Sequence, residues 1–370
     1  MSPRDGAPRF DRSPGPCCAS GLPTSRGATT SGEVKAVVLV GGEGTRLRPL
    51  TETIPKPLIP LVDRPFLEHV LDHLAAHGVG EALLSSPYLE EVFASFLQAR
   101  HDGPRVTWIT EPTPLGTAGA VANAAREIGE PFLVLNGDIL TDLDLTGLVA
   151  LHREAGAIAT IALALVEDAR PYGLVTVSEA GRVLEFREKP QQAIPGLVNA
   201  GTYVLEPEAV RDVPPEGAVS IEREVFPALI DSGASVHGYV SQDYWKDLGT
   251  PESYLRATFD ALEGRVKGLS YAAPYVDSTA RVSLRCHLGR WVVVGPAARI
   301  GDDAEVEDSV LLAGAVIGEG ARVRDSIVGP SATIGRGAVL SGAVLAEGAV
   351  IPSGTSADGA RVAAGKVLGA

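Results

Sequence analysis

The feature that most restricts the fold is a nearly regular spacing of aliphatic residues toward the end of the chain. From Ile300 to Ile351 these residues recur at steps of six or five, and alanines follow many of them four positions later. A period close to six is typical of a hexapeptide-repeat parallel β-helix, in which each coil buries its aliphatic side chains by stacking on its neighbours. We therefore predict a β-helix over residues 291–370, and the five-residue steps indicate an imperfect coil. The aliphatic positions are Ile300, Val306, Leu312, Ile317, Val323, Val328, Ile334, Leu340, Leu345 and Ile351.

The stretch 37–58, VVLVGGEGTRLRPLTETIPKPL, restricts the first part of the chain in a different way. Its apolar start is typical of a buried parallel strand. Three glycines within four residues then let the backbone turn sharply, and successive N–H groups in such a turn form a concave anion site. Arg46 and Lys56 add two cations that no nearby acid obviously neutralises.

Two better-known phosphate-binding loops do not fit this stretch. A P-loop ends in Gly-Lys-Ser/Thr, whereas Thr45 and Arg46 follow the last glycine, Gly44. A dinucleotide-binding fingerprint needs a third glycine where Leu47 stands. An anion loop of another kind remains, and the simplest alternative is an ordinary glycine turn.

Composition limits the number of domains, the binding partners and the location that this chain can have. A chain of 370 residues with 45% hydrophobic content is long enough for two folded domains. Its net charge of −14 argues against binding to nucleic acid or to an anionic membrane. No apolar stretch approaches the roughly 20 residues that span a bilayer. The three cysteines lack metal-site spacing, which favours a cytoplasmic location. Residues 1–32 are rich in Pro, Gly and Ser, so we expect them to be disordered.

Alternating strand and helix signals predict an α/β domain over residues 33–265, joined to the β-helix by a linker over 266–290. Within it, Asp138 follows an apolar run, and Asp247 precedes a helix start at Thr250-Pro251. Ligands bind at the carboxyl edge of open α/β sheets, so the two aspartates are candidates to share one Mg²⁺. Taken alone, Asp138 also fits an ordinary turn carboxylate.

Polar residues at two later strand ends suit a sugar phosphate. Glu188 can accept hydrogen bonds from sugar hydroxyls, and Lys189 can hold a phosphate. Asn199 offers both a donor and an acceptor. In isolation, Glu188 and Lys189 also fit a charged strand end on the surface.

Eight sequence blocks occur in an order that resembles the sugar-phosphate nucleotidyltransferases, also called NDP-sugar pyrophosphorylases. The resemblance is strongest to bacterial mannose-1-phosphate guanylyltransferases that carry a C-terminal left-handed β-helix. It covers nearly everything after residue 33 and implies a doubly wound, mixed α/β sheet of Rossmann-like type. The blocks are GGEGTRLRPLT, PKPL, EPTPLGTAG, NGD, PYG, EKP, NAG and WKDLGT.

The resemblance also implies a role for each matching residue. Asp138 and Asp247 would hold Mg²⁺, and Arg46 and Lys56 would act with them in catalysis by contacting the phosphates. The residues implied to surround the nucleotide are Gly41, Gly42, Gly44, Thr45, Gly116 and Thr117. Those implied to hold the sugar phosphate are Gly173, Glu188, Lys189 and Asn199.

The predicted reaction is transfer of a nucleotidyl group from an NTP, with GTP favoured, to a sugar 1-phosphate, giving an NDP-sugar and pyrophosphate. Mannose 1-phosphate is the favoured acceptor. Glucose-1-phosphate thymidylyl-, uridylyl- or adenylyltransferases and enzymes for modified sugar or cyclitol phosphates are alternatives within the class. A hexapeptide acyltransferase and a non-catalytic regulatory homologue are alternatives outside it. We expect a homo-oligomer formed through the β-helix.

Overall fold

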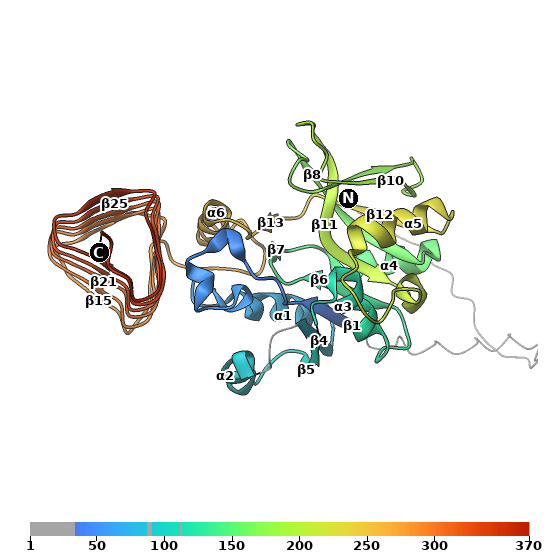
Figure 1. Cartoon of the computed structure of the whole chain (residues 1–370), viewed down its shortest axis with the longest axis horizontal. Coiled ribbons are helices and arrows are strands. Elements are labelled where there is room, and N and C mark those ends of the chain that lie inside the picture. The colour runs from blue at the N-terminus through green and yellow to red at the C-terminus, as the bar shows by residue number, and fades with distance from the viewer. Residues whose placement is uncertain (1–33, 87–90, 112, 370) are drawn as a thin grey trace, which may run out of the picture. The chain divides into compact units, whose positions relative to one another are not determined.

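A computed structural model describes residues 34–86, 91–111 and 113–369, so the expectation of disorder over residues 1–32 lies outside the described residues. The first part of the chain forms a nine-stranded mixed sheet (Figure 1). Its parallel centre consists of β6 (Phe132–Asn136), β1 (Lys35–Leu39), β4 (Glu81–Ser86) and β5 (Arg105–Thr110), and β11 (Gly196–Leu205) runs antiparallel to β6. The other strands are β8 (Ala159–Val166), β9 (Gly173–Val177), β10 (Val183–Glu188) and β12 (Val236–Ser241).

Helices cover both faces of this sheet, as predicted for a doubly wound fold. Successive residues of β1 point to opposite faces, so Val38 and Val37 belong to different hydrophobic clusters. The Val38 cluster includes side chains of α1 (Phe66–Ala76), α2 (Glu91–Ala99) and α4 (Leu145–Ala155). The Val37 cluster includes side chains of α3 (Gly116–Ala125), a π-helical turn η5 (Ile221–Val225) and α5 (Phe226–Asp231).

Short elements beside the sheet carry the candidate residues. Three 3₁₀ turns, η1 (Thr45–Leu47), η2 (Leu50–Glu52) and η3 (Lys56–Leu58), follow the glycine loop. A two-stranded pair, β2 (Pro60–Leu61) and β3 (Arg64–Pro65), precedes α1, and η4 (Pro207–Val210) follows β11. A separate two-stranded ribbon pairs β7 (Ile139–Thr141) with β13 (Trp245–Asp247).

The helix α6 (Pro251–Leu262) begins where the sequence predicts it. Thr250 accepts a hydrogen bond from the Ser253 N–H at 3.1 Å, and the Ser253 hydroxyl accepts one from the Thr250 N–H at 3.0 Å. This reciprocal pair satisfies two N–H groups that a helix start leaves open. Within the described ranges, no helix combines the length and apolar character needed to cross a membrane.

The last part of the chain is a parallel β-helix with three faces, and each face is a sheet of parallel strands from successive coils (Figure 1). The first coil begins at β14 (Tyr275–Val276), which pairs with β17 (Val292–Val294), so much of the predicted linker over 266–290 is already β-helix. The sequence prediction missed this coil although Val276, Val282 and Leu288 continue the six-residue spacing. The other strands are β15 (Arg281–Val282), β16 (His287–Leu288), β18 (Arg299–Ile300), β19 (Glu305–Glu307), β20 (Ser309–Leu311), β21 (Val316–Ile317), β22 (Arg322–Arg324), β23 (Ile327–Val328), β24 (Thr333–Ile334), β25 (Val339–Ser341), β26 (Val344–Leu345), β27 (Val350–Ile351), β28 (Ser356–Asp358) and β29 (Arg361–Val362).

The coils differ in length, as expected for an imperfect hexapeptide coil: strand pairs of the first coil lie 18 residues apart, as in Arg281–Arg299, whereas those of later coils lie 17 apart. Val310 pairs with Ile327 and Ile327 with Val344, so equivalent positions lie 17 residues apart. The buried aliphatic positions follow a strict order of six, six and five, because the interior residue of β20 is Leu311 rather than Leu312. Leu312 packs outside the coil, in a cluster that also contains Phe259 of α6.

Candidate active site

A cavity of about 320 Å³ opens at the carboxyl ends of β1 and β6. These strands are parallel neighbours, and the Gly137 N–H donates to the Leu39 carbonyl at 2.9 Å. The glycine loop after β1 and the aspartate after β6 therefore meet at one edge of the sheet, where open α/β sheets bind their ligands. Six of the predicted residues line the cavity: Gly41, Gly42, Lys56, Gly116, Thr117 and Asp138.

The two cations of the glycine-loop segment are paired with the two predicted metal ligands. Lys56 Nζ lies 2.5 Å from Asp138 Oδ2, and the Lys56 side chain is only 8% exposed. Arg46 Nη2 lies 3.7 Å from Asp247 Oδ2 in a more open position. Both acids that pair with these cations come from distant parts of the chain, which is why none is evident in the nearby sequence.

The β7–β13 ribbon brings the two aspartates together. Asp247 lies opposite Ile139, and the Leu248 N–H donates to the Asp138 carbonyl at 3.0 Å. Burial raises the pKa of Asp247, and the nearby negative charge of Asp138 raises it further. Within the described part of the chain, the buried Oδ1 atom of Asp247 has no hydrogen-bond partner.

This pair of carboxylates fits a magnesium ion. A buried carboxylate oxygen without a donor is costly unless a cation or a water satisfies it. Mg²⁺ commonly takes one or two protein carboxylates and completes its shell with water and substrate phosphates. Over the described ranges, no group of three or more His, Cys, Asp and Glu side chains is placed to hold a metal. A metal ion here would take Asp138 and Asp247 from the chain.

Gly249 leaves the space that Arg46 and Asp247 occupy. A Cβ atom at position 249 would lie 2.3 Å from Arg46 Nη2 and 2.8 Å from Asp247 Oδ1, far inside van der Waals contact. The block WKDLGT therefore combines three functions in six residues: a carboxylate at the end of β13, clearance at Gly249, and the α6 cap at Thr250.

The start of α3 closes one side of the cavity. Gly116 has a φ of +70°, and a Cβ atom there would lie 2.5 Å from the Val219 carbonyl oxygen, so only glycine fits without strain. The Thr117 hydroxyl donates to Glu222 Oε2 at 2.8 Å and accepts from the Ile221 N–H at 2.9 Å. Thr117 thus lines the cavity while its hydroxyl holds the start of η5.

Glu111 is a cavity residue that the sequence analysis did not single out. Its carboxylate is buried, with the residue 5% exposed, and both oxygens accept from uncharged donors. Ser85 Oγ donates to Oε1 at 3.2 Å, and the Leu115 N–H donates to Oε2 at 3.0 Å. The signal was present, because Glu111 is the first residue of the EPTPLGTAG block.

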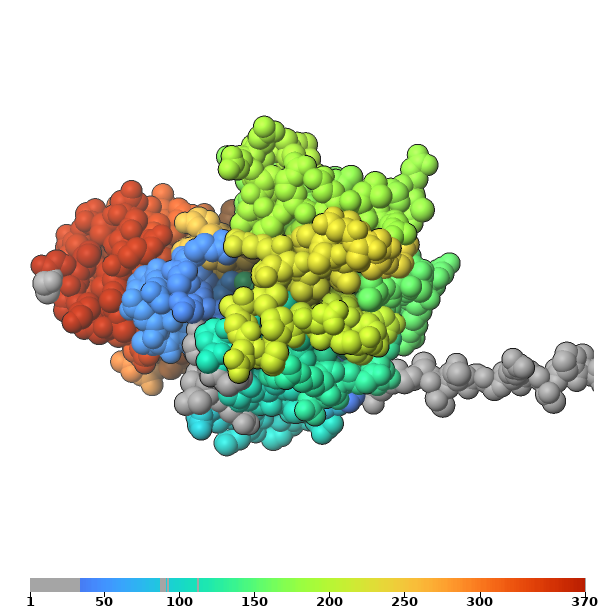
Figure 2. All heavy atoms as spheres, turned by 45° about the vertical axis from the view of Figure 1, so that its right-hand side comes forward, coloured from blue at the N-terminus to red at the C-terminus, as the bar shows by residue number. Residues whose placement is uncertain are grey.

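The predicted sugar residues gather away from this cavity lining. Gly173 and Glu188 are opposite each other on β9 and β10, and Lys189 Nζ lies 3.5 Å from Glu188 Oε1. Asn199 is held internally, since its Oδ1 accepts from the Gly201 N–H and its Nδ2 donates to the Tyr203 hydroxyl. The outer ends of β8 and β10 extend beyond the body of the sheet (Figure 1), and this yellow-green part of the chain rises from the surface in Figure 2.

Tyr172 and Trp245 link the sugar candidates to the ribbon, and the sequence analysis assigned no role to either. Their rings meet edge to face, with centroids 5.0 Å apart. The Tyr172 carbonyl accepts from the Lys189 N–H at 2.9 Å. Burial raises the pKa of Tyr172, and the negative charge of Asp247 raises it further.

Two predicted nucleotide residues do not line the cavity. Thr45 begins η1, and Gly44 precedes it with a φ of +60°. The Gly44 carbonyl accepts a hydrogen bond from Thr51 Oγ1 at 2.9 Å. Both residues shape the loop from which Arg46 reaches Asp247.

Comparison with known proteins gives consistent matches over the chain. Residues 35–264 match the nucleotidyl transferase family model, and residues 271–370 match the GMPPB C-terminal domain. A mannose-1-phosphate guanylyltransferase of Mycobacterium tuberculosis is 39% identical over 76% of this chain and 80% of its own length. A probable mannose-1-phosphate guanylyltransferase 3 of Oryza sativa is 36% identical over the same shares.

A solved structure, HddC from Yersinia pseudotuberculosis, superposes with a TM-score of 0.54 at 30% identity, covering 61% of this chain and 98% of that one. HddC has also been solved in complex with GMP-PN, and that structure gives a TM-score of 0.53. The family match, the identity to these relatives and the cavity at the edge of a doubly wound sheet agree, and the chain therefore belongs to the nucleotidyl transferase family.

Proposed function

We propose that this protein transfers the guanylyl group of GTP to mannose 1-phosphate, releasing pyrophosphate and forming GDP-mannose. Relatives of this name match most of the chain, and HddC has been solved with GMP-PN. The observation that carries the proposal is the cavity itself. It has a buried carboxylate, Glu111, on one wall and the Lys56–Asp138 pair on another.

The base is selected by Glu111 in this proposal. Guanine presents two adjacent N–H donors, N1–H and the N2 amino group, whereas adenine and the pyrimidines present no such pair. Each Glu111 oxygen already has one protein donor and retains capacity for a second. A base lacking the two donors would leave this buried carboxylate short of partners, and such mismatches discriminate strongly between substrates.

The chemistry requires no protein nucleophile. An oxygen of the sugar phosphate attacks the α-phosphorus of GTP, the bond from that phosphorus to the bridging oxygen breaks, and pyrophosphate leaves with the electron pair. Both reactants are anions, so the chain must position them and offset their repulsion. Lys56 and Arg46 provide positive charge at the phosphates. Mg²⁺ bound by Asp138 and Asp247 would supply further charge compensation there.

The sugar phosphate lies against Gly173, Glu188, Lys189 and Asn199 in this proposal. Glu188 accepts from hydroxyl groups, and Lys189, whose side chain is 58% exposed, reaches the phosphate. A Cβ atom at Gly173 would lie 2.6 Å from the Phe186 ring and 3.0 Å from Glu188 Oε2, so glycine here leaves the space that these side chains occupy. A cytoplasmic location and a homo-oligomer formed through the β-helix stay predictions.

The proposal is tested by measuring pyrophosphate release with GTP, ATP, UTP and dTTP against mannose, glucose and galactose 1-phosphates. We expect the highest kcat/KM with GTP and mannose 1-phosphate. In Glu111→Gln we expect the preference for GTP over ATP to fall by roughly 100-fold, because one acceptor oxygen becomes a donor. If no pair of nucleotide and sugar phosphate releases pyrophosphate, the proposed reaction is wrong. If Glu111→Gln keeps the preference for GTP over ATP, only the role of Glu111 in base selection is wrong.

A further inference from the structure

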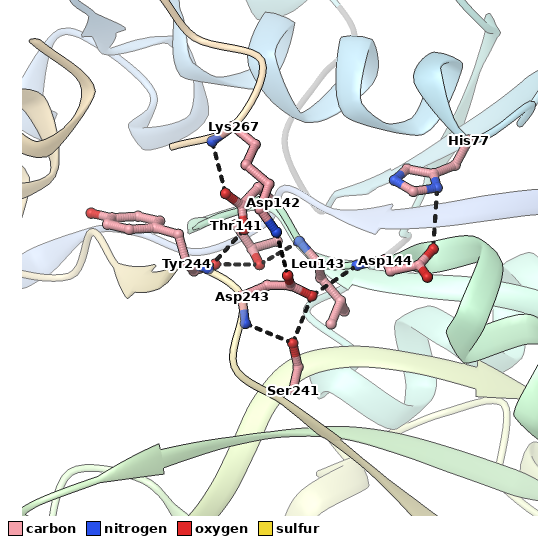
Figure 3. Close-up of polar contacts among 9 residues, drawn as sticks. All are labelled: His77, Thr141, Asp142, Leu143, Asp144, Ser241, Asp243, Tyr244 and Lys267. Carbon is pink, nitrogen blue, oxygen red and sulfur yellow. Dashed lines mark hydrogen bonds and ion pairs between the residues drawn. The ribbon is translucent and has the colours of Figure 1, made fainter. Parts of the chain in front are cut away.

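A polar network stabilises one end of the β7–β13 ribbon (Figure 3). This is the end that lies away from Asp138 and Asp247. Asp142 directly follows β7, and its carboxylate accepts two main-chain hydrogen bonds. The Tyr244 N–H donates to Oδ1 at 2.7 Å, and the Lys267 N–H donates to Oδ2 at 2.7 Å. One side chain therefore joins the end of β7, the start of β13 and the segment after α6.

Neighbouring side chains strengthen the same junction. Thr141 Oγ1 donates to the Tyr244 carbonyl at 2.8 Å and accepts from the Leu143 N–H at 3.1 Å. Asp243 accepts from Lys267 Nζ and from Ser241 Oγ, each at 2.7 Å. Figure 3 shows these groups meeting around the main chain of Asp243 and Tyr244. The junction lies outside the cavity lining described above.

The ribbon depends on hydrogen bonds at its ends because it is short. Each strand has three residues, and an isolated two-stranded hairpin is at best marginally stable in water. Its register is therefore set by what holds its two ends. The aspartate end is held by the Leu248 N–H on the Asp138 carbonyl. The other end is held at Tyr244, three residues before Asp247.

We propose that Asp142 is a positioning residue for the reaction: its two carboxylate oxygens hold Tyr244 and Lys267, and thereby fix Asp247 opposite Asp138. This inference rests on the proposed function. Residues that contact metal ligands directly typically change metal affinity or activity by roughly 10–100-fold when they are replaced. Asp142 contacts neither aspartate and acts through the strand, so its effect is expected toward the lower end of that range. Because Lys267 leads from α6 toward the first coil, the same carboxylate also fixes where the catalytic part of the chain ends.

Asp142→Asn tests the proposal with little change of shape. Asparagine keeps one acceptor oxygen, but its amino group would face an N–H that now lacks a partner. Asp144→Asn is the matched control, because it removes the same charge two residues away. Asp144 caps α4 by accepting from the Gly147 N–H at 3.0 Å, and asparagine caps a helix equally well.

We expect Asp142→Asn to lower kcat by roughly tenfold or more, with KM for mannose 1-phosphate within about twofold of wild type. Binding of Mn²⁺ to the protein with a GTP analogue that cannot react at the α-phosphate should weaken by a similar factor. Amide hydrogen exchange should accelerate at Tyr244 and along β13, and not across the whole sheet. Asp144→Asn should match wild type in all three measurements.

Equal kcat, equal Mn²⁺ binding or equal exchange in the two variants would overturn the positioning role. If Asp142→Asn fails to fold, Thr141→Val loosens the same junction more gently and should shift the three measurements in the same direction. If the wild-type protein releases no pyrophosphate, the proposed function is wrong. Mn²⁺ binding and amide hydrogen exchange would still test the role of Asp142.

Discussion

The two folded parts of this chain use charged residues in opposite ways. In the β-helix, ion pairs repeat along the coils on exposed side chains, as in Arg322–Glu305 and Arg336–Glu319, and each joins positions one coil apart. In the α/β part, Lys56 and Asp138 form a pair that is 82 residues apart in the sequence and partly buried. Exposed pairs contribute little, whereas charges held out of water interact strongly.

The difference shows where single residues matter. A coil of the β-helix contacts only its neighbours, so a change there acts locally and mainly on stability. The candidate site depends on a few contacts between distant segments, so a change there acts mainly on turnover. Each of the following experiments substitutes residues that contrast these two behaviours.

The largest difference is expected between Asp138→Asn and Glu319→Gln. Each removes a carboxylate that lies within 2.8 Å of a cation, with side-chain exposures of 36% and 46%. We expect Asp138→Asn to lower kcat by roughly 100-fold or more, with a much smaller change in affinity for the sugar phosphate. Glu319→Gln should leave both unchanged. Pyrophosphate release measures both, and near-normal turnover in Asp138→Asn would contradict its assignment.

A core substitution in the β-helix should have the opposite effect: it should lower stability and leave turnover unchanged. Ile334 is fully buried on β24, and truncation of such a side chain to alanine costs about 2–5 kcal/mol of unfolding free energy. Val339, in the same coil, is 41% exposed and serves as the control. We expect Ile334→Ala to lower the midpoint of chemical unfolding while kcat at 25 °C stays normal.

A loss of turnover in Ile334→Ala, measured where the protein is fully folded, would show that the coils act on the site directly. An equal loss of stability in Val339→Ala would show that burial does not set the cost.

The smallest expected effect is the pH dependence that His152, in the α/β part, contributes to stability. Burial lowers the pKa of His152 to about 4, below its unfolded value near 6.5, and the charge of Arg153 lowers it further. The unfolded chain therefore takes up a proton before the folded one does, so stability is full above pH 6.5 and falls as the pH drops toward 4. Between pH 6.5 and 5.5 the loss is about 1 kcal/mol.

Chemical unfolding at several pH values measures this loss. His152→Gln should reduce the dependence by about this amount, and His73, whose pKa burial also lowers to about 4, should account for part of what remains. His287→Gln, at an exposed position of the β-helix, should leave the dependence unchanged. The same slope in wild type and His152→Gln would place the pH sensitivity elsewhere.

Much of the fold was predictable because its signals are local. The α6 cap follows from Thr250 and Pro251, and the mixed sheet and the coils of the β-helix follow from the spacing of apolar residues. The first coil was missed although Val276, Val282 and Leu288 take the positions of Val294, Ile300 and Val306 in the next coil. Leu312 was misplaced because two leucines are adjacent, and only the coil geometry decides which one points inward.

The sequence by itself determined the repeat, the glycine loop, and the chemical identity of the groups at the sheet edge, because period and residue type are properties of short segments. Only the tertiary structure decided that Lys56 meets Asp138, that Arg46 meets Asp247, and that Asp142 holds the strand carrying Asp247. Those contacts depend on strand order and register, which bring together segments that carry no sign of one another in the chain. Electrostatic interactions fall off with distance in space rather than in sequence, and so the charges at this site could be matched only after the fold was known.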